Sequence, residues 1–336
     1  MQIAMKLFYT LCFCFFAGIS FSQTGFATDD PRYKPLVMGA LGNLKSMDYD
    51  SCLIKFKEAF TIKQTSYLST MRNCACAHSA QDYNYRDEQL KIAFDLSWGG
   101  SKNVFDGYPE FEYLKGTDFE KIIQEKYLEY AKAAGVNIEL MEEFKTIQYE
   151  DQRYRREMNE VEKKYGWKSP QMDSLWVLQN KADSINTARI MEIMDAQGYP
   201  GKSVVGDGYA STAFLVIQHA DLEIQEKYLP LISDAADKEE VPWRSVALLV
   251  DRVEMRNERA QIYGSQVSRH PETNEYYFSE IQNPMKIDSI RNTVGLGPLQ
   301  GYADNWEFKW DVERHIKINK EVKEINALKK EEEEKK

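Results

Sequence analysis

Side chains that could do acid–base chemistry or bind a polar ligand gather in the second half of the 336-residue chain. His219 follows an apolar stretch and stands two residues before Asp221. Because histidine titrates near neutral pH, His219 could serve as a general base or as a metal ligand. An aspartate that accepts a hydrogen bond from the ring would orient it. The pattern predicts a hydrolase-like site whose candidate catalytic residues are His219, Asp221 and Asp251.

The same three residues also have structural interpretations. If His219 ends a helix, its ring can bond the last helical carbonyls. Asp221 can cap the N-terminus of the next helix. Asp251 follows the apolar run 247–250, so it enters a buried helix face and needs a partner there, for which His219 and Arg153 are the candidates. Sequence spacing leaves the catalytic and the structural interpretations open.

Amide, guanidinium and hydroxyl groups close to these residues suit the binding of a polar ligand. Arg252 is adjacent to Asp251 and faces elsewhere on a helix, so the two do not simply satisfy each other. In the strand expected after them, period-two alternation would place Gln261 and Tyr263 on one face and Gln266 on the other. Two amides beside a tyrosine hydroxyl favour binding a ligand over hydrolysing one. The candidate binding residues are Arg153, Gln218, Arg252, Gln261, Tyr263 and Gln266.

Several well-known catalytic motifs are missing from the sequence. There is no GxSxG motif for a serine nucleophile, no HExxH motif for zinc, and no glycine-rich phosphate loop. A metal site built from His219, Asp221 and Asp251 would lack a pair of histidines at ligand spacing. We therefore predict no metal and no cofactor, and we favour a protein without enzymatic activity over an enzyme.

Helical patterning predicts the elements that carry these residues. We expect a long helix over 173–197, ended by Gly198. Its buried stripe is predicted to comprise Ile185, Ile190, Ile193 and Met194. Asp207 is the expected N-cap of the next helix, which contains Phe214. Further helices are expected over 221–237, over 242–256 and from Asn283 to Gly295.

A change of period after Ala260 predicts a β-hairpin. Its strands, 261–267 and 276–278, flank a turn that contains Pro271. Gly264 inside the first strand indicates a bulge or a close approach of the backbone.

The order of several short polar motifs resembles that of a bacterial family known as domain of unknown function 6624. The likeness covers about residues 145–302 and implies a fold and a set of recurrent polar positions, with no activity or cofactor attached. The motifs that carry it are Asp151-Gln152-Arg153, Asn186, Gly198-Tyr199-Pro200, Gln218-His219-Ala220-Asp221, Asp251-Arg252, the segment 261–266 and the segment 295–299.

The first third of the chain contains a repeat with a period of 34 residues. Tyr49 recurs as Tyr83 and Ala59 as Ala93, while Arg86 stands where the first copy has Cys52. This pattern resembles the tetratricopeptide repeat, a helix-turn-helix unit that usually stacks in threes. A degenerate third unit is expected over 105–130, with Thr117 or Asp118 as a helix N-cap and with turns at Gly99-Gly100 and Asp106-Gly107. The array would be either a docking surface for a protein or peptide partner or a packing platform for the second domain.

The N-terminal end of the chain predicts an exported protein. Lys6 followed by the apolar run 7–19 predicts a signal peptide over 1–22, too short for stable membrane insertion. The mature protein would be periplasmic or secreted. Its three cysteines, Cys52, Cys74 and Cys76, are either buried free thiols or include one bridge from Cys52 to one of the others.

These observations predict a mainly α fold: a short tetratricopeptide-like helical repeat array over 23–135, then an α-helical domain over 138–302 with a small β-hairpin near 260–279. A charged helix or tail over 303–336 follows. A net charge of −10 argues against nucleic acid as a partner. Three functions remain open: an exported protein-interaction or ligand-binding module, able to take a small polar ligand; a hydrolase-like enzyme; or a purely structural envelope protein.

Overall fold

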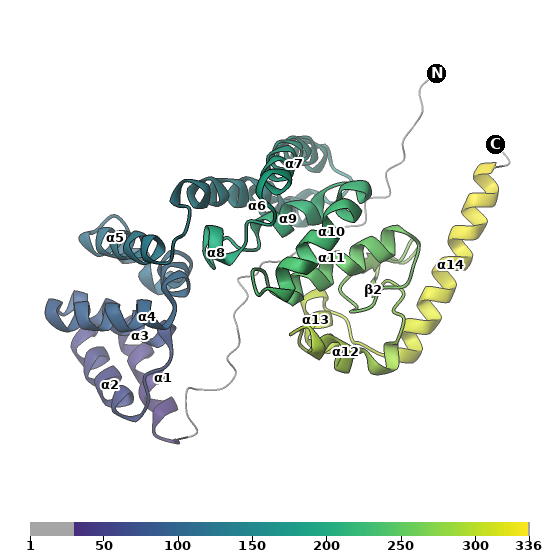
Figure 1. The fold of residues 1–336 in the computed structure, drawn as a ribbon. Coiled ribbons are helices and arrows are strands. Elements are labelled where there is room, and N and C mark those ends of the chain that lie inside the picture. Colours follow the sequence, from purple (N-terminus) through teal and green to yellow (C-terminus); the bar gives the residue numbers. More distant parts are fainter. Residues whose placement is uncertain (1–29, 335–336) are drawn as a thin grey trace. The chain divides into compact units, whose positions relative to one another are not determined.

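A computed structural model describes residues 30–334 and confirms the mainly α fold class (Figure 1). The described residues form helices and a single two-stranded antiparallel sheet. The predicted signal peptide, residues 1–22, lies outside them. Within 30–334, no helix combines the length and the apolar character needed to cross a bilayer. The chain divides into two compact units, and each is described by itself.

The N-terminal unit comprises residues 30–144 and 202–210. Consecutive helices from α1 to α5 pack against one another, most extensively α3 against α4 and α1 against α2. The elements of this unit are α1 (Tyr33–Lys45), α2 (Tyr49–Ile62), α3 (Tyr67–Ser79), α4 (Tyr83–Gly107), the 3-10 helix η1 (Pro109–Leu114), α5 (Asp118–Ala133), the start of α6 (Ile138–Tyr165) and the short α8 (Lys202–Val205).

Two of these helix pairs share the same local geometry at the predicted period. Asp48 caps α2 by accepting from the N–H of Ser51, and Asp82 caps α4 in the same way from Tyr85. The residue before each cap, Met47 or Gln81, has a left-handed backbone with φ of 62° or 60°. The α1–α2 and α3–α4 pairs are therefore copies of one helix-turn-helix unit in backbone as well as in sequence.

The end of the repeat differs from the sequence prediction in one place. Gly99 and Gly100 do not form a turn between helices; instead α4 kinks at Ser97, whose Oγ accepts a hydrogen bond from the N–H of Gly100. The second part of α4 and η1 then stand before α5, which Thr117 caps as predicted. A kink replaces the turn because the Ser97 side chain acts as an N-cap for the second part of α4, so the helix continues directly after this one non-helical residue.

A disulfide bond joins the two repeat copies, since Cys52 of α2 is bonded to Cys76 of α3 with their Cα atoms 6.1 Å apart. The prediction of three buried free thiols is therefore wrong, and the alternative of one bridge from Cys52 is confirmed. Cys74 is the one cysteine of residues 30–334 that remains a buried thiol. Cys76 could not bridge Cys74 because residues two apart on a helix face different directions. The α2–α3 contact brings Cys76 opposite Cys52 instead.

Breaking this disulfide is expected to lower the free energy of unfolding of the N-terminal unit by about 3 kcal/mol, because the bond closes a loop of 24 residues in the unfolded chain. Urea unfolding of the protein with and without dithiothreitol measures the effect. The double variant Cys52→Ala/Cys76→Ala should match the reduced protein and be insensitive to the reductant. Equal midpoints for oxidised and reduced wild-type protein would contradict the prediction.

The C-terminal unit comprises residues 145–201 and 211–334. Its long helices are most of α6 and α7 (Pro170–Gln197), and the short α9 packs on α7, α10 and α11. The remaining elements are α9 (Thr212–His219), α10 (Leu222–Asp237), α11 (Trp243–Arg256), β1 (Val267–Arg269), β2 (Tyr276–Phe278), η2 (Pro284–Lys286), α12 (Ile287–Thr293), α13 (Leu299–Ala303), η3 (Asp304–Trp306) and α14 (Val312–Glu334).

Several predicted boundaries hold and others need correction. Gly198 ends α7 with a φ of 81°, as expected of a glycine at that position. Ile185 does not belong to the buried stripe of α7, because it is 60% exposed, whereas Ile190, Ile193 and Met194 are buried. Asp207 does not cap α9, which begins at Thr212 after a turn.

The hairpin is shorter than predicted, since β1 pairs with β2 only from Val267 to Arg269. The segment 261–266 is a loop rather than a strand. Behind the hairpin lies the first part of α14, where His315 accepts a hydrogen bond from the N–H of Ile281 and Asn319 donates to the carbonyl of Phe278. His315 and Asn319 thus bond the first half of α14 to the hairpin and to the segment that follows it.

Candidate functional site

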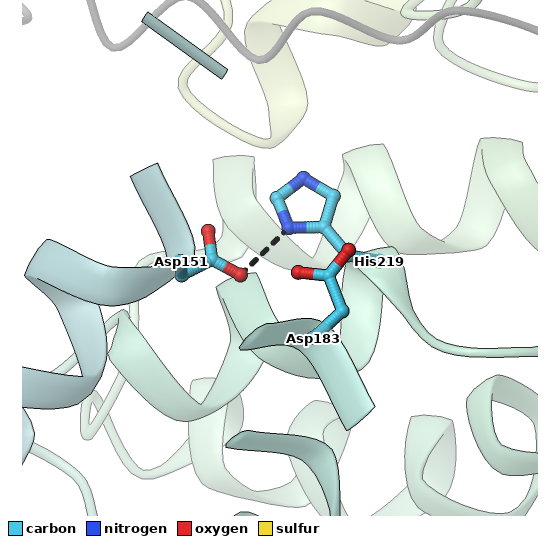
Figure 2. Close-up of side chains that lie close together, drawn as sticks. All are labelled: Asp151, Asp183 and His219. Atoms are coloured by element: carbon cyan, nitrogen blue, oxygen red, sulfur yellow. Dashed lines mark hydrogen bonds and ion pairs between the residues drawn. The ribbon is translucent and has the colours of Figure 1, made fainter. Parts of the chain in front are cut away.

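His219 pairs with an aspartate that lies 68 residues away in the chain. Its Nδ1 is 3.0 Å from Oδ1 of Asp151, which projects from α6 (Figure 2). His219 is the last residue of α9, and Ala220 after it has an extended backbone that ends the helix. The predicted role of the ring as a cap for its own helix is therefore wrong, because the ring reaches across to α6.

Both members of this pair are removed from solvent, with side chains 4% and 1% exposed for His219 and Asp151. An ionised carboxylate can only accept hydrogen bonds, so Nδ1 carries the ring proton and donates a hydrogen bond to Asp151. That leaves Nε2 as the nitrogen with a free lone pair. Nε2 points away from the carboxylates (Figure 2) and has no hydrogen-bond partner within residues 30–334.

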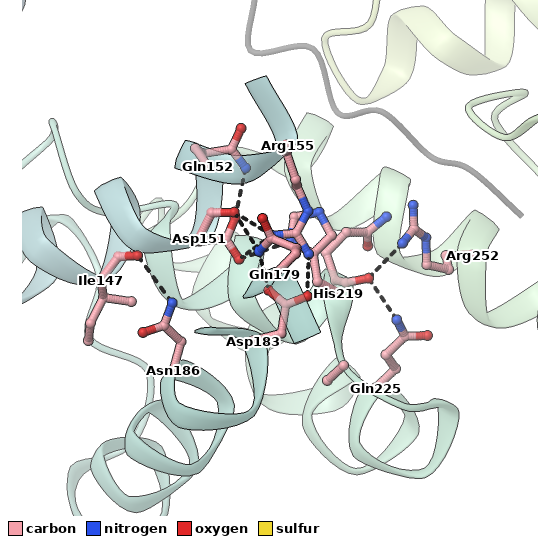
Figure 3. A network of polar contacts seen from close by, with 12 residues as sticks. Ile147, Asp151, Gln152, Arg155, Gln179, Asp183, Asn186, His219, Gln225 and Arg252 are labelled. Atoms are coloured by element: carbon pink, nitrogen blue, oxygen red, sulfur yellow. Dashed lines mark hydrogen bonds and ion pairs between the residues drawn. The ribbon is translucent and has the colours of Figure 1, made fainter. Parts of the chain in front are cut away.

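Two further charged side chains complete the cluster (Figure 3). The Arg155 guanidinium is 3.4 Å from Oδ1 of Asp151 and 2.7 Å from Oδ2 of Asp183 on α7. Gln179 donates from Nε2 to the backbone carbonyl of Asp151 at 3.1 Å and to Asp183 at 2.8 Å. These bonds join α6 to α7 around the Asp151 carboxylate, which accepts the hydrogen bond from His219.

The electrostatics of the cluster keep His219 neutral and Asp151 ionised. Burial lowers the pKa of His219, and the nearby Arg155 charge lowers it further. Burial alone would raise the pKa of Asp151, but the hydrogen bond from His219 and the Arg155 charge hold that pKa below its ordinary value. At neutral pH, His219 therefore presents an uncharged ring with an available lone pair at Nε2.

A carboxylate oxygen of Asp151, a carboxylate oxygen of Asp183 and a ring nitrogen of His219 lie within 4.8 Å of one another, close enough to be considered as the ligands of a metal ion. Arg155, however, already supplies the positive charge between the two carboxylates. The histidine atom that faces the carboxylates is Nδ1, which holds a proton in this arrangement. The set fits a buried hydrogen-bonded ion network better than it fits a cation.

Asp221 and Arg153 lie outside this cluster. Asp221 occupies the N-cap position of α10, but its exposed side chain makes no capping hydrogen bond. Arg153 pairs with Glu150 one turn back on α6 and lies over the ring of Tyr154. Neither residue orients His219, and the predicted pairing of Asp251 with His219 or Arg153 is wrong.

Asp251 instead organises the loop 261–266. Its carboxylate accepts three backbone hydrogen bonds, from Ile262 at 2.7 Å and from Tyr263 and Ser265 at 2.8 Å each. Burial raises the pKa of Asp251, and the three N–H donors offset only part of that rise. From the opposite side, Arg291 of α12 donates to the carbonyl of Tyr263 at 2.8 Å. The loop is held between a buried carboxylate and a buried guanidinium.

The predicted binding residues Gln261 and Gln266 belong to the same loop and are fully buried. Gln261 bonds the backbone of Gln266 through both ends of its amide. Period-two alternation fails here because the backbone curls around Asp251 instead of pairing with another strand. Gly264 has a φ of 67°, and a Cβ there would be 3.2 Å from the side chains of Ile281 and Leu299, which confirms the close approach predicted for it.

Arg252 connects this loop to α9. It donates to Oε1 of Gln266 at 3.3 Å and to the carbonyl of Gln218 at 2.9 Å. Gln218 in turn donates to the carbonyl of Leu248. These residues bond one another, and Asp251 and Gln266 are fully buried.

Sequence reasoning therefore found the histidine and missed its partners, Asp151, Arg155 and Asp183. One local signal existed, because Arg155 follows Asp151 by four residues and so lies on the same face of a helix. The pairing with His219 had no such signal. It depends on how α6, α7 and α9 pack.

One comparison with known proteins gives a match. A family model described as "Family of unknown function (DUF6624)" matches residues 138–313. No curated protein and no solved structure matches the chain.

Proposed function

The chain belongs to the family of unknown function DUF6624, and from its site geometry we propose that it is an exported ligand-binding module in which His219 accepts a hydrogen bond from a small polar ligand. The matched residues include Asp151, Asp183 and His219. Asp151 fixes the ring, and Nε2 is the atom that the ligand meets.

The observation that carries this proposal is the unpartnered Nε2. A buried acceptor without a donor costs about 1 to 3 kcal/mol, so such atoms are rare in folded proteins. Nε2 of His219 has no donor within residues 30–334 although its ring is 4% exposed and its other nitrogen is firmly bonded. A ligand N–H or O–H would satisfy it.

Two other buried histidines in the same unit provide an internal comparison. Nε2 of His315 accepts from Ile281, and its Nδ1 is 3.2 Å from the amide of Asn319. Nδ1 of His270 accepts from two backbone N–H groups, and its Nε2 is 3.7 Å from Glu321. Both ring nitrogens of His270 have a compatible partner, because Nδ1 accepts and the Nε2–H faces a carboxylate, whereas Nε2 of His219 has none within residues 30–334.

The same geometry supports a second candidate function. A ring that is held by a carboxylate at Nδ1 and free at Nε2 is the arrangement of a general base. A hydrolase-like reaction would use Asp151 as the orienting residue, in place of Asp221 or Asp251. The sequence offers no nucleophile motif for it, so the binding function takes precedence.

Export and partner docking form part of the proposal. The Cys52–Cys76 disulfide is typical of oxidising compartments, which agrees with the predicted signal peptide and a periplasmic or secreted location. The helix pairs of the N-terminal unit resemble tetratricopeptide repeats, which commonly dock a protein or peptide. We assign the unit this supporting role.

The test is a ligand screen by thermal shift with sugars, amino acids and small amides as probes, comparing wild-type protein with His219→Phe. The phenyl ring keeps the bulk of the site and removes the acceptor. His78→Phe in the N-terminal unit is the matched control. We expect at least one probe to stabilise wild type and His78→Phe but not His219→Phe. Probes that act on all three proteins alike, or on none, would refute the proposal.

A further inference from the structure

A second buried acceptor belongs to the same cluster as His219. Gln179 of α7 is fully buried, and its amide nitrogen donates to Oδ1 of Asp183 at 2.8 Å and to the backbone carbonyl of Asp151 at 3.1 Å. Both of these oxygens accept hydrogen bonds, so the NH2 end of the Gln179 amide has to face them. The other end of the amide, Oε1, has no hydrogen-bond partner within residues 30–334.

Gln179, Asp183 and His219 lie together in the polar network of Figure 3. Asp183 accepts from Gln179, and one of its oxygens lies within 4.8 Å of a ring nitrogen of His219. The two atoms of this cluster that lack a partner, Oε1 of Gln179 and Nε2 of His219, are both acceptors. A hydroxyl group brings lone pairs of its own that need donors, whereas the NH2 group of an amide only donates. An NH2 group therefore suits this cluster best.

The buried charges that act on these acceptors cancel one another. Asp151 and Asp183 are two carboxylates, and the Arg155 guanidinium pairs with both. A second guanidinium, that of Arg252, is also buried, and its charge adds to burial and to Arg155 in lowering the pKa of His219. A charged ligand would leave one buried charge without a counter-charge, which is costly. A neutral ligand leaves the balance as it is.

We propose that the ligand of His219 is a small neutral molecule with a primary amide group, whose NH2 donates to Nε2 of His219 and to Oε1 of Gln179. Two buried acceptors in one cluster, the fixed orientation of the Gln179 amide and the balance of charges carry this choice. The inference rests on the proposed function, because it names the class of ligand that binds at the same ring.

The experiment uses probes that share one heavy-atom skeleton: acetamide, acetone, acetamidinium and acetate. Acetone lacks the NH2 group, acetamidinium keeps NH2 groups and adds a positive charge, and acetate carries a negative charge. Each probe is titrated into the full chain labelled with ¹⁵N-histidine, and the signal of Nε2 of His219 is followed by NMR, with His219→Phe for assignment. We expect the dissociation constant of acetamide to be at least about fivefold lower than that of each other probe, the ratio that one hydrogen bond supports.

A pair of variants tests the second acceptor. Gln179→Met keeps the length of the side chain and removes Oε1, so it should weaken the binding of acetamide about fivefold and leave that of acetone unchanged. Gln171→Met makes the same change at an exposed position of α7 and is the matched control, which should alter neither. If Gln179→Met does not fold, as its melting curve will show, the probe series with wild-type protein decides by itself.

Tighter binding of acetamidinium or of acetate than of acetamide would overturn the choice of a neutral ligand and leave the proposed function standing. Equal binding of acetone and acetamide would overturn the role of the NH2 group. Unchanged affinity for acetamide in folded Gln179→Met would remove Gln179 from the site. If no probe moves the Nε2 signal, this inference falls, whereas a sugar or an amino acid that stabilises wild type and not His219→Phe would still support the proposed function.

Discussion

Replacing Asp251 with alanine is expected to lower the free energy of unfolding of the C-terminal unit by about 3 to 5 kcal/mol. The carboxylate is fully buried and accepts three backbone N–H groups of the loop 261–266. Without it these donors lose their partners inside the protein. The Arg291 guanidinium, also buried, loses the nearby negative charge that balances it.

Urea unfolding followed by circular dichroism measures this change, with hydrogen exchange of the loop amides as a local readout. Asp234→Ala is the matched control, because Asp234 is an exposed residue on α10. It should change stability by less than about 0.5 kcal/mol. If Asp251→Ala unfolds at the same urea concentration as Asp234→Ala, the loop does not depend on the carboxylate.

The second large effect is expected for Asp151→Ala, at about 3 kcal/mol. The substitution leaves the Nδ1–H of His219 without its acceptor and removes one of the two carboxylates that face Arg155. Loss of the proposed ligand response should accompany the loss of stability. Asp151→Asn keeps an oxygen acceptor for the ring, so it should be milder than alanine while still removing the charge.

Glu150→Ala, one residue away on α6, is the control for this prediction. Glu150 is partly exposed and pairs with Arg153, which is also partly exposed, so the change should cost less than about 1 kcal/mol. Thermal and urea unfolding of the two variants beside wild type make the comparison. Equal stabilities of Asp151→Ala and Glu150→Ala would show that the Asp151–His219 pair contributes little.

Local sequence rules predicted many of the helices well because the signals lie within the helices or directly beside them. Gly198 after α7 has the positive φ that a helix end needs. Thr117 accepts a hydrogen bond from the N–H of Phe119 and so caps α5, as its residue type and position indicate. The repeat was visible because copies 34 residues apart share caps as well as core residues, as Asp48 and Asp82 show.

The failures occur where a hydrogen bond of the folded structure overrides the local preference of a segment. Asp251 on α11 curls the loop 261–266 into a shape that period-two alternation cannot describe. Ser97 restarts a helix where two glycines predicted a turn. Neither bond can be anticipated from the hydrophobic period of the segment that it shapes.

The candidate site was only half accessible to sequence reasoning. His219 could be singled out from its position after an apolar helix, but its partner comes from a distant helix. Asp221 was a candidate because it follows His219 by two residues, and Asp251 because it follows an apolar run and needs a buried partner. The structure places neither beside the ring. Long-range pairs of this kind follow from the packing of α6, α7 and α9, which no motif spacing encodes.

The most direct test of the account is nitrogen NMR of ¹⁵N-histidine-labelled protein as a function of pH, with His219→Phe used to assign the His219 ring. We expect a neutral ring at about pH 6.5, protonated at Nδ1, because burial and Arg155 lower the pKa of His219 below its ordinary value. His219 then binds a second ring proton more readily in the unfolded state than in the folded state. Its contribution to the free energy of unfolding should therefore decline as the pH falls below about 6.5. A ring protonated at Nε2, or a pKa above about 6.5, would contradict the central claim that Nε2 is a free acceptor held ready by Asp151.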